Sequence, residues 1–444
     1  MARRAKSKRL DVWMNGERVG NWNISAQGQH EFRYGQAWVD ADDARPISLS
    51  MPLQPPEVPY RGSVVESFFE NLLPDSADIR RRVQTRFGAA STSAFDLLAE
   101  IGRDCVGAIQ LLPSDQPPEN IRQIDGEPLD EEAVADILRS TTSSAPLGQR
   151  DDESFRISIA GAQEKTALLW HEQQWQRPLG TTPTTHLFKL PLGRVGNMQA
   201  DLSTSVENEW LCAQIVREFG LPVANCDIAD FADQHVLVVE RFDRRLAHDK
   251  QWLIRLPQED MCQATGTPPA LRYESDGGPG ISDICTLLLG SRNAAMDRRS
   301  FFKAQVLFWL LCATDGHAKN FSVFTEPQGR FYLTPIYDVL SAYPILGGGR
   351  NQLAPQKAKM AMAVSGKNRH YKWSEIQARH WISTAAEVGL EAAAEEDILE
   401  LAKQATSVVE RVSALLPQNF PDIVSGPIFD GLLQSAERLN ALRN

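Results

Sequence analysis

A dense group of polar residues follows a strongly apolar stretch in the second half of the chain. The segment CATDGHAKNFSVF, residues 312–324, places Asp315, His317, Lys319 and Asn320 within six positions, shortly after FFKAQVLFWLL. An apolar helix that ends here delivers all four side chains to one place. A carboxylate can accept a proton, and the oxygens of Asp and Asn are hard ligands that suit magnesium. The segment is therefore a candidate site for proton abstraction beside a metal ion.

The spacing within this segment is that of a known catalytic loop. Asp315 and Asn320 are separated by four residues, as in the D-x-x-x-x-N loop in which Asp is the base and Asn binds Mg²⁺. Asp338 follows a β-like run, where a second metal-binding carboxylate is expected. The spacing alone occurs by chance in many chains, and an Asx turn at Asp315 is the alternative. The ordered set of apolar helix, loop, strand pair and lone aspartate is more specific.

A lysine in an apolar strand is the second candidate. Lys189 lies within HLFKLPL, where a charged group is costly unless it has an anionic partner. A kinase uses such a lysine to contact the α- and β-phosphates of ATP. Glu207 and Glu209, near the start of the next expected helix, are the candidate carboxylates. The alternatives are a lysine that reaches solvent from an edge strand, and glutamates that interact with the helix dipole.

Two further segments fit contacts with a nucleotide. AGAQEKT, residues 160–166, is expected to be a tight loop between strands, whose backbone N–H groups can cap phosphates with Lys165 nearby. It is not a Walker A loop, and an ordinary hairpin turn is the alternative. ERFDRR, residues 240–245, ends an expected interior strand, where a two-lobed kinase contacts adenine. The alternative there is a charged surface cluster.

The elements that must position these residues predict an α+β fold with two lobes. Residues 1–112 begin β-rich, with a type I′ hairpin expected at Asn15–Gly16, and continue with helical spacing up to residue 112. Residues 113–153 are rich in Pro, Ser and acidic residues and are expected to be a surface connection that contains one short helix. Residues 154–258 predict a nucleotide-binding β lobe, and residues 259–444 a helical catalytic lobe with one strand-like interlude.

Composition limits the function classes. The chain has 444 residues and a net charge of −11, which disfavours non-specific nucleic-acid binding because phosphate contacts need a surplus of Lys and Arg. Six scattered cysteines without a CxxC pair are expected to be reduced thiols. No apolar run predicts a membrane span or a signal peptide, so a cytoplasmic location is expected. Residues 350–372 form a basic stretch, which Arg379 and His380 extend towards acidic targets or DNA. A solvated positive face is the alternative.

Taken together, these motifs are familiar. ISIAGAQEKTALL, HLFKLP, SVENEW, VERFDR, TDGHAKNFSVF and YDVLSAYP resemble the HipA family of bacterial serine/threonine kinases, the toxins of type II toxin–antitoxin pairs. RPISLSMPL and FFENLLPD match the family too, so the resemblance spans nearly the whole chain. It implies a two-lobed protein-kinase-like fold that uses ATP and Mg²⁺.

The resemblance also implies a role for each matching residue. Asp315 is the expected proton acceptor, Asn320 and Asp338 are the expected Mg²⁺ ligands, and Ser158 is the expected autophosphorylation site. We hypothesise that a phosphate on Ser158, in a half-buried strand, expels the phosphate loop and inactivates the enzyme. The other expected nucleotide contacts are Ala160, Gly161, Ala162, Gln163, Glu164, Lys165, Lys189, Glu240, Arg241, Phe242, His317, Lys319, Tyr337 and Asp338.

The implied partners follow from the same resemblance. They are a helix-turn-helix antitoxin similar to HipB, operator DNA bound through that complex, and an aminoacyl-tRNA synthetase as target, glutamyl-tRNA synthetase in particular. Phosphorylation of that target is expected to stall translation and to drive growth arrest or persistence. Two alternatives remain open. One is a small-molecule kinase of the aminoglycoside type, which shares D-x-x-x-x-N, and the other is a repressor scaffold that has lost catalysis.

Overall fold

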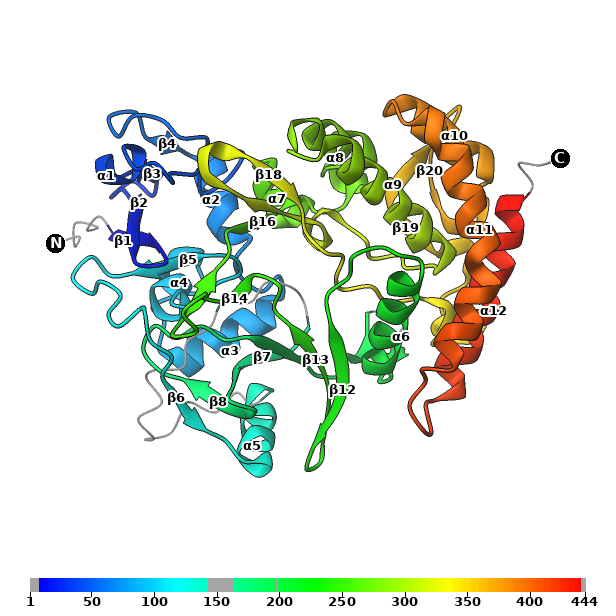
Figure 1. The fold of residues 1–444 in the computed structure, drawn as a ribbon, viewed down its shortest axis with the longest axis horizontal. Coiled ribbons are helices and arrows are strands. Elements are labelled where there is room, and N and C mark those ends of the chain that lie inside the picture. The colour runs from blue at the N-terminus through cyan, green and yellow to red at the C-terminus, as the bar shows by residue number, and fades with distance from the viewer. Residues whose placement is uncertain (1–7, 143–157, 159–162, 197–198, 441–444) are drawn as a thin grey trace.

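The computed structural model describes residues 8–142, 158, 163–196 and 199–440 (Figure 1). The N-terminal elements, blue to cyan in Figure 1, lie on one side of the view, and the C-terminal helices, orange to red, lie on the opposite side. The green strands of the middle of the chain lie between and below them. This mixture of sheet and helix confirms the predicted α+β class.

A five-stranded antiparallel sheet organises the N-terminal part, in the order β4-β3-β2-β1-β5. The predicted hairpin is confirmed: Asn15 and Gly16 have φ values of 46° and 87°, which a type I′ turn requires. Trp22 of the sheet stacks on Phe69 with ring centroids 4.0 Å apart. The elements are β1 (Lys8–Met14), β2 (Glu17–Ile24), β3 (His30–Tyr34), α1 (Gln36–Val39), β4 (Tyr60–Arg61), α2 (Ser63–Glu70), α3 (Ala77–Phe87), α4 (Ala94–Ile101) and β5 (Ile109–Leu112).

The helical prediction for residues 93–112 is wrong in its second half. The helix α4 follows its N-cap Ser93, whose Oγ accepts from the backbone of Asp96, but it ends at Ile101. Gly102 then lets the chain fold back tightly, since a Cβ there would lie 2.7 Å from the Cβ of Leu111. Residues 109–112 pair with β1 as a strand that is buried on both faces, and an apolar run of that kind has no period to distinguish it from a helix.

The β lobe is a six-stranded sheet in the order β12-β13-β9-β7-β8-β6. The strand that carries Lys189, β9, lies between β13 and β7, so the lysine is interior and not at an edge. The elements are β6 (Gly126–Pro128), α5 (Glu131–Thr141), β7 (Lys165–His171), β8 (Gln174–Pro178), β9 (His186–Lys189), β10 (Gly193–Val195), β11 (Ala200–Leu202), β12 (Cys226–Phe231), β13 (Gln234–Glu240), β14 (Arg244–Leu246) and β15 (Leu253–Arg255).

Part of the expected connection, residues 113–153, belongs to this lobe. The strand β6 pairs with β8, and α5 buries Val134 and Leu138 completely in a cluster that includes Phe188 of β9. Polar composition marks this segment as surface, but one apolar stripe of α5 is enough to fix it on the sheet.

The helical lobe is built around α9, whose Phe301, Val306 and Trp309 are fully buried. It contains two strand groups, β16-β17-β18 and β19-β20, of which only the first overlaps the predicted interlude. The elements are α6 (Ser205–Glu218), β16 (Gln258–Asp260), α7 (Met261–Ala264), α8 (Ile281–Leu287), α9 (Ala294–Leu310), β17 (Ser322–Thr325), β18 (Phe331–Leu333), β19 (Lys359–Ser365), β20 (Arg369–Lys372), α10 (Ala378–Glu387), α11 (Glu391–Ser413) and α12 (Asp422–Leu439).

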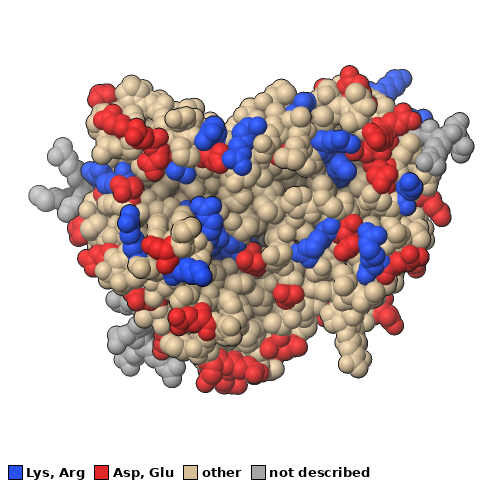
Figure 2. Space-filling model, viewed as in Figure 1, with Lys and Arg blue, Asp and Glu red and all other residues tan. Residues whose placement is uncertain are grey.

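The surface charge is unevenly distributed. On the face drawn in Figure 2, acidic side chains gather along the lower edge and the outer rims, whereas basic side chains also lie around the hollow in its middle. None of the helices in the described residues is both long and apolar enough to cross a membrane.

Candidate active site

One cleft brings together residues from all parts of the chain. It is lined by Lys189 of β9, by Asp315 and Asn320 of the loop after α9, and by Asp338 after β18. Apolar side chains such as Leu187 and Val339 line it as well. We call it the active-site cleft. It also contains these described residues that the sequence singles out: Lys165, Glu209, Glu240, Arg241, Phe242, His317, Lys319 and Tyr337.

The lysine of β9 is held between two carboxylates. Lys189 Nζ lies 2.6 Å from Glu209 Oε1 and 2.7 Å from Asp338 Oδ1. Glu207 is the wrong candidate of the two glutamates, because residues two positions apart on a helix do not share a face. It lies 3.2 Å from His235 Nε2 instead. The ion pair with Glu209 connects the β sheet to α6, and the ion pair with Asp338 connects it to the catalytic lobe.

These contacts fix the charges at the centre of the cleft. Burial alone would lower the pKa of Lys189, but Asp338 and Glu209 offset it and raise that pKa. Burial alone would raise the pKa of Asp338, but Lys189 lowers it to about 2. Burial raises the pKa of Glu209 in spite of the lysine beside it. The ammonium group and the Asp338 carboxylate are therefore both charged at neutral pH.

The loop that carries Asp315 is closed by its own backbone. The Asp315 carbonyl accepts hydrogen bonds from Asn320 Nδ2 at 2.9 Å and from the His317 backbone N–H at 2.8 Å. Because Asn320 donates from its Nδ2, its amide oxygen is the atom that remains to bind a ligand. The loop approaches α9 closely at Gly316, where a Cβ would lie 2.3 Å from the ring of Phe308.

Asp338 has an unusual backbone conformation. Its φ is 60°, a left-handed value that is uncommon outside glycine and that Asp tolerates better than most residues. The preceding Tyr337 does not present a free hydroxyl to the cleft, since its OH contacts Ser322 Oγ at 2.5 Å and donates to the Lys319 carbonyl at 2.9 Å. Tyr337 therefore shapes the wall of the cleft and fixes the position of Asp338.

The donor set of the cleft fits magnesium. A carboxylate from Asp338 and an amide oxygen from Asn320 are hard oxygen ligands, which Mg²⁺ binds in small number together with water and substrate phosphates. No cluster of three or more His, Cys, Asp or Glu side chains suited to a metal occurs among the described residues, so a transition-metal cage is not indicated in that part of the chain.

The two other polar residues of the loop are differently placed. Lys319 Nζ is buried against Asp75 Oδ1, 2.6 Å away, and so ties the catalytic loop to the N-terminal part. His317 is 7% exposed, and burial lowers its pKa. The residue lines the cleft, and its buried Nδ1 has no hydrogen-bond partner among the described residues.

The phosphate loop is described only at its end. Ala160, Gly161 and Ala162 lie outside the described residues. Of the remaining loop residues, Gln163 donates from Nε2 to the Leu190 carbonyl at 2.5 Å, and Glu164 pairs with Arg82 of α3, so neither side chain is free. Burial and the repulsion of Lys189 lower the pKa of Lys165 to about 8.

The expected adenine contacts separate into two groups. Glu240 and Phe242 line the cleft, and the Phe242 ring packs beside Tyr337 at 5.8 Å. The side chain of Arg241 is buried elsewhere and binds Asp243 Oδ2 at 2.9 Å and Asp104 Oδ2 at 3.3 Å. These carboxylates thus occupy the Arg241 side chain, and the nucleotide contact expected at this strand end, which is one of backbone groups, stays a prediction.

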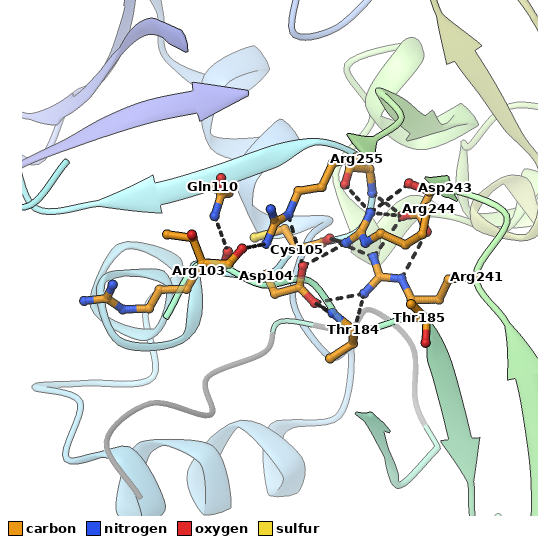
Figure 3. Close-up of polar contacts among 12 residues, drawn as sticks. Arg103, Asp104, Cys105, Gln110, Thr184, Thr185, Arg241, Asp243, Arg244 and Arg255 are labelled. Carbon is orange, nitrogen blue, oxygen red and sulfur yellow. Dashed lines mark hydrogen bonds and ion pairs between the residues drawn. The ribbon is translucent and has the colours of Figure 1, made fainter. Parts of the chain in front are cut away.

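Figure 3 shows the cluster that captures Arg241. Asp104, in the loop after α4, points between three guanidinium groups, and its Oδ1 lies 2.9 Å from Arg244 and 3.3 Å from Arg255. All of these side chains are at most 6% exposed. We call this group the Asp104 cluster. It joins the N-terminal part to the segment after β13 that borders the cleft, and nothing in the local sequence distinguishes it from a surface charge cluster.

Ser158 lies deeper than expected. Its exposed fraction is 0%, it belongs to no strand, and its Oγ donates to the Leu72 carbonyl at 2.8 Å. Its backbone N–H donates to the carbonyl of Asp104 at 3.0 Å. The half-buried strand position that the sequence suggests is therefore wrong, and the hydroxyl is enclosed between the β lobe and the N-terminal part.

The basic stretch 350–372 is partly neutralised. Arg369 pairs with Glu274 and lies 3.4 Å from Glu387. His380 is 6% exposed, its ring stacks on His370 at 3.9 Å, and its Nδ1 accepts from the Gln377 backbone at the start of α10. These contacts leave His380 little surface for a DNA contact, whereas its neighbour Arg379 is exposed.

One contact in the cleft is absent from the sequence expectations. Tyr273, in the segment before α8, donates its OH to Asp315 Oδ1, and its ring meets that of His317 edge-on at 5.0 Å. Its position in a loop segment, 42 residues before Asp315, gives no periodicity from which the contact is predictable.

Comparison with known proteins places this geometry in a family. The family model described as HipA-like C-terminal domain matches residues 157–412, more than half of the chain, and the model described as HipA N-terminal domain matches residues 10–112. The chain belongs to the HipA family. The predicted family membership is thus confirmed.

Individual proteins are also similar to this chain over most of its length. A Sinorhizobium fredii protein named as a kinase, Y4mE, is 32% identical over 388 residues, which is 86% of each chain. A serine/threonine-protein kinase toxin HipA of Shewanella oneidensis is 27% identical over 76% of each chain. The solved HipA of Shewanella oneidensis, in complex with HipB and operator DNA, matches 97% of each chain with a TM-score of 0.78 and 24% identity. The two-lobed kinase-like fold is confirmed by this match.

Proposed function

We propose that this HipA-family protein is an ATP- and Mg²⁺-dependent serine/threonine protein kinase that acts as the toxin of a toxin–antitoxin pair. The convergence of Lys189, Asp315, Asn320 and Asp338 on one cleft supports this proposal most directly. These residues come from three separate segments, and a protein without phosphoryl transfer has no physical need to bring them together. Relatives that are named as kinases support the same reaction class.

The proposed reaction transfers the γ-phosphoryl group of ATP to a serine or threonine hydroxyl. The acceptor oxygen forms a bond to phosphorus while the bond from phosphorus to the β–γ bridging oxygen breaks, and ADP leaves. Asp315 takes the proton of the acceptor hydroxyl. Lys189, oriented by Glu209, holds the α- and β-phosphates, and Glu240 and Phe242 border the adenine end of the cleft. Asn320 and Asp338 would hold Mg²⁺, which would supply positive charge against the phosphates.

The proposed partners follow from the relatives. The solved Shewanella protein is in a complex with HipB and operator DNA, and we extend this assembly to a helix-turn-helix antitoxin and operator DNA for the present chain. Arg379 is the residue that we retain as a possible DNA contact. An aminoacyl-tRNA synthetase, glutamyl-tRNA synthetase first, is the proposed target, and its phosphorylation would arrest translation.

We propose further that Ser158 is the autophosphorylation site and that its modification inactivates the enzyme. A phosphate adds almost two negative charges, which the enclosed position between Leu72 and Asp104 cannot solvate. The modified serine must therefore leave its site and take the adjoining phosphate loop with it. If phosphorylated protein and the Ser158→Ala variant bind ATP equally well, this part of the proposal is wrong.

The kinase proposal is tested with purified protein and with cells. Asp315→Asn keeps the shape of the side chain but removes the base, so phosphorylation of proteins in a cell lysate should fall by about 100-fold or more. Asp430→Asn, at an exposed position of α12, is the matched control and should behave as wild type. Phosphoproteomics of cells that express each form identifies the target. Phosphorylation of small alcohols such as aminoglycosides in place of proteins would favour the small-molecule kinase.

A further inference from the structure

The base of the cleft is held by a side chain from outside its own loop. Tyr273 donates a hydrogen bond to Asp315 Oδ1. A carboxylate bound on one oxygen keeps a fixed orientation, and its second oxygen remains available to an acceptor hydroxyl. Burial and the charge of Asp315 raise the pKa of Tyr273, so the phenol keeps its proton and acts as a donor.

The neighbouring Arg272 carries an uncompensated charge. Lys189 is matched by two carboxylates and Lys319 by Asp75, but Arg272 makes no ion pair with any carboxylate of the described chain. Its Nη1 donates to the Pro269 carbonyl at 3.3 Å, the Tyr273 hydroxyl is a further hydrogen-bond partner of the guanidinium, and its buried Nε has no partner among the described residues. A guanidinium in this state is a ready donor for a phosphate-like anion.

Arg272 is also placed where such an anion would pass. Its guanidinium lies 5.1 Å from the centre of the Tyr273 ring, whose hydroxyl touches Asp315. The residue lines the active-site cleft and also a second groove, which is bordered by Arg80 and Arg81 of α3. Arg272 therefore stands between the nucleotide side of the cleft and the outside, from which an acceptor protein must approach.

Hydrogen bonds and close packing hold the segment that contains Arg272 and Tyr273 in a fixed position. The Arg272 carbonyl accepts from the backbone of Ala318 in the catalytic loop at 3.2 Å. The next residue along, Glu274, accepts from the Ala363 backbone of β19 at 2.6 Å and pairs with Arg369. Gly280 packs against Glu274 so closely that a Cβ would lie 2.5 Å from its carboxyl carbon. Such mounting pre-organises the donors and lowers the entropy lost when they engage a ligand.

We propose that Arg272 is a catalytic residue that binds the phosphoryl group during its transfer, and that Tyr273 is a positioning residue that orients Asp315. This inference rests on the proposed kinase function. As the acceptor oxygen bonds to phosphorus and the bond to ADP breaks, the guanidinium donates to the equatorial oxygens of the transferring group. At the same time Asp315 accepts the acceptor proton on the oxygen that Tyr273 leaves free.

The test separates binding from turnover. Arg272→Gln, Arg272→Lys and Tyr273→Phe are purified as full chains, ATP binding is measured directly, and single-turnover phosphorylation of a lysate protein or a serine peptide is followed. We expect Arg272→Gln to lower turnover by about 100-fold with ATP affinity and melting temperature unchanged. Arg272→Lys should recover part of that loss, since it restores charge without the planar fork. Tyr273→Phe should lower turnover by about tenfold, with little change in the KM of ATP.

Two control variants match these changes outside the cleft. Arg81→Gln removes an arginine that lines the second groove but not the active-site cleft. Tyr332→Phe removes the hydroxyl of another tyrosine that carries an arginine over its ring, Arg292 at 3.9 Å. Both variants should keep wild-type turnover.

The following results would contradict the inference. Wild-type turnover in Arg272→Gln excludes a role in transfer, and an equal loss of ATP affinity and turnover makes Arg272 a ground-state nucleotide contact. A faster Tyr273→Phe enzyme shows that the phenol blocks the base and does not position it. A folded wild-type protein that binds ATP but phosphorylates nothing overturns the kinase function itself, and the Arg272–Tyr273 inference with it.

Discussion

At the scale of single residues, charge pairing decides which groups are free to act. In the cleft, Lys189 lies between Glu209 and Asp338, Lys319 pairs with Asp75, and Asp338 is held as an anion with a pKa of about 2. Lys165 differs, because burial and its neighbour Lys189 lower its pKa further than Asp338, Glu209 and Asp75 raise it. The first prediction concerns this residue.

ATP affinity should fall above pH 8. Burial and Lys189 lower the pKa of Lys165 to about 8, so above that pH the nucleotide-free enzyme has lost this charge and must take up a proton to bind the phosphates. The decline should approach about tenfold per pH unit when one proton is linked to binding. The ATP affinity of the Lys165→Arg variant should stay constant over the same pH range. Calorimetric or fluorescence titration with ATP from pH 7 to 9.5 measures the affinity. A wild-type affinity that does not change with pH would contradict the role of Lys165 in ATP binding.

At the scale of elements, the end of α9 sets the position of Asp315. The helix stops at Leu310, and the following loop folds back so closely that only hydrogen fits at Gly316, above the ring of Phe308. That ring is itself packed against Phe321 with centroids 5.4 Å apart, so it has little room to move. The loop and the helix thus behave as one unit.

Gly316→Ala should damage both stability and catalysis. The added methyl group overlaps the Phe308 ring, which should cost about 1–3 kcal/mol of unfolding free energy and shift Asp315 from its place. Urea denaturation and single-turnover assays measure the two effects. Gly348→Ala is the control, because a Cβ there meets nothing within 4 Å. Equal stability of the two variants would show that the loop relaxes freely.

At the scale of the whole molecule, the N-terminal part is attached through buried charges. The Asp104 cluster (Figure 3) joins it to the kinase-like lobes, and so does the Asp75–Lys319 pair. A third contact is Glu259, whose Oε1 accepts from the Leu49 backbone at 2.7 Å. The ion pairs of the first two contacts stabilise the fold only while every charged partner is present.

Asp104→Asn should be strongly destabilising. It leaves Arg241 and Arg244 with Asp243 as their remaining carboxylate and Arg255 with none among the described residues, and breaking a buried ion network typically costs about 3–5 kcal/mol. Chemical denaturation measures the loss. Asp78→Asn, which removes one partner of an exposed pair with Arg81, should cost less than about 1 kcal/mol. A similar small loss for both variants would mean that water reaches the cluster.

Stability should fall as the pH rises from 5 to 8.5. Burial raises the pKa of Glu259 from 4.5 to about 8, so the folded chain holds a proton that the unfolded chain releases. The stabilisation is complete below pH 4.5 and is lost as the pH passes through 8. Asp260, raised by burial to about 7, acts in the same direction. Glu259→Gln should flatten the pH dependence of the melting temperature, and an unchanged slope would contradict the burial of a protonated Glu259.

Local sequence was enough for the parts of the site that lie close together in the chain. The spacing of Asp315 and Asn320, the lysine within an apolar strand and the Asn15–Gly16 turn each carry their physical reason within a few residues. The long apolar run before residue 312 also predicted a helix, which the structure has as α9. Periodicity could not predict the strand β5, because its apolar run has no period.

Tertiary structure alone decided the pairing of distant groups. The choice of Glu209 over Glu207, the capture of Arg241 by Asp104, and the contact of Tyr273 with Asp315 all depend on how lobes far apart in sequence pack. The strength of a charge pair falls within a few ångströms, and one step along a helix turns a side chain by about 100°. The sequence by itself therefore determined which residues are able to do the chemistry, and the packing determined which of them meet.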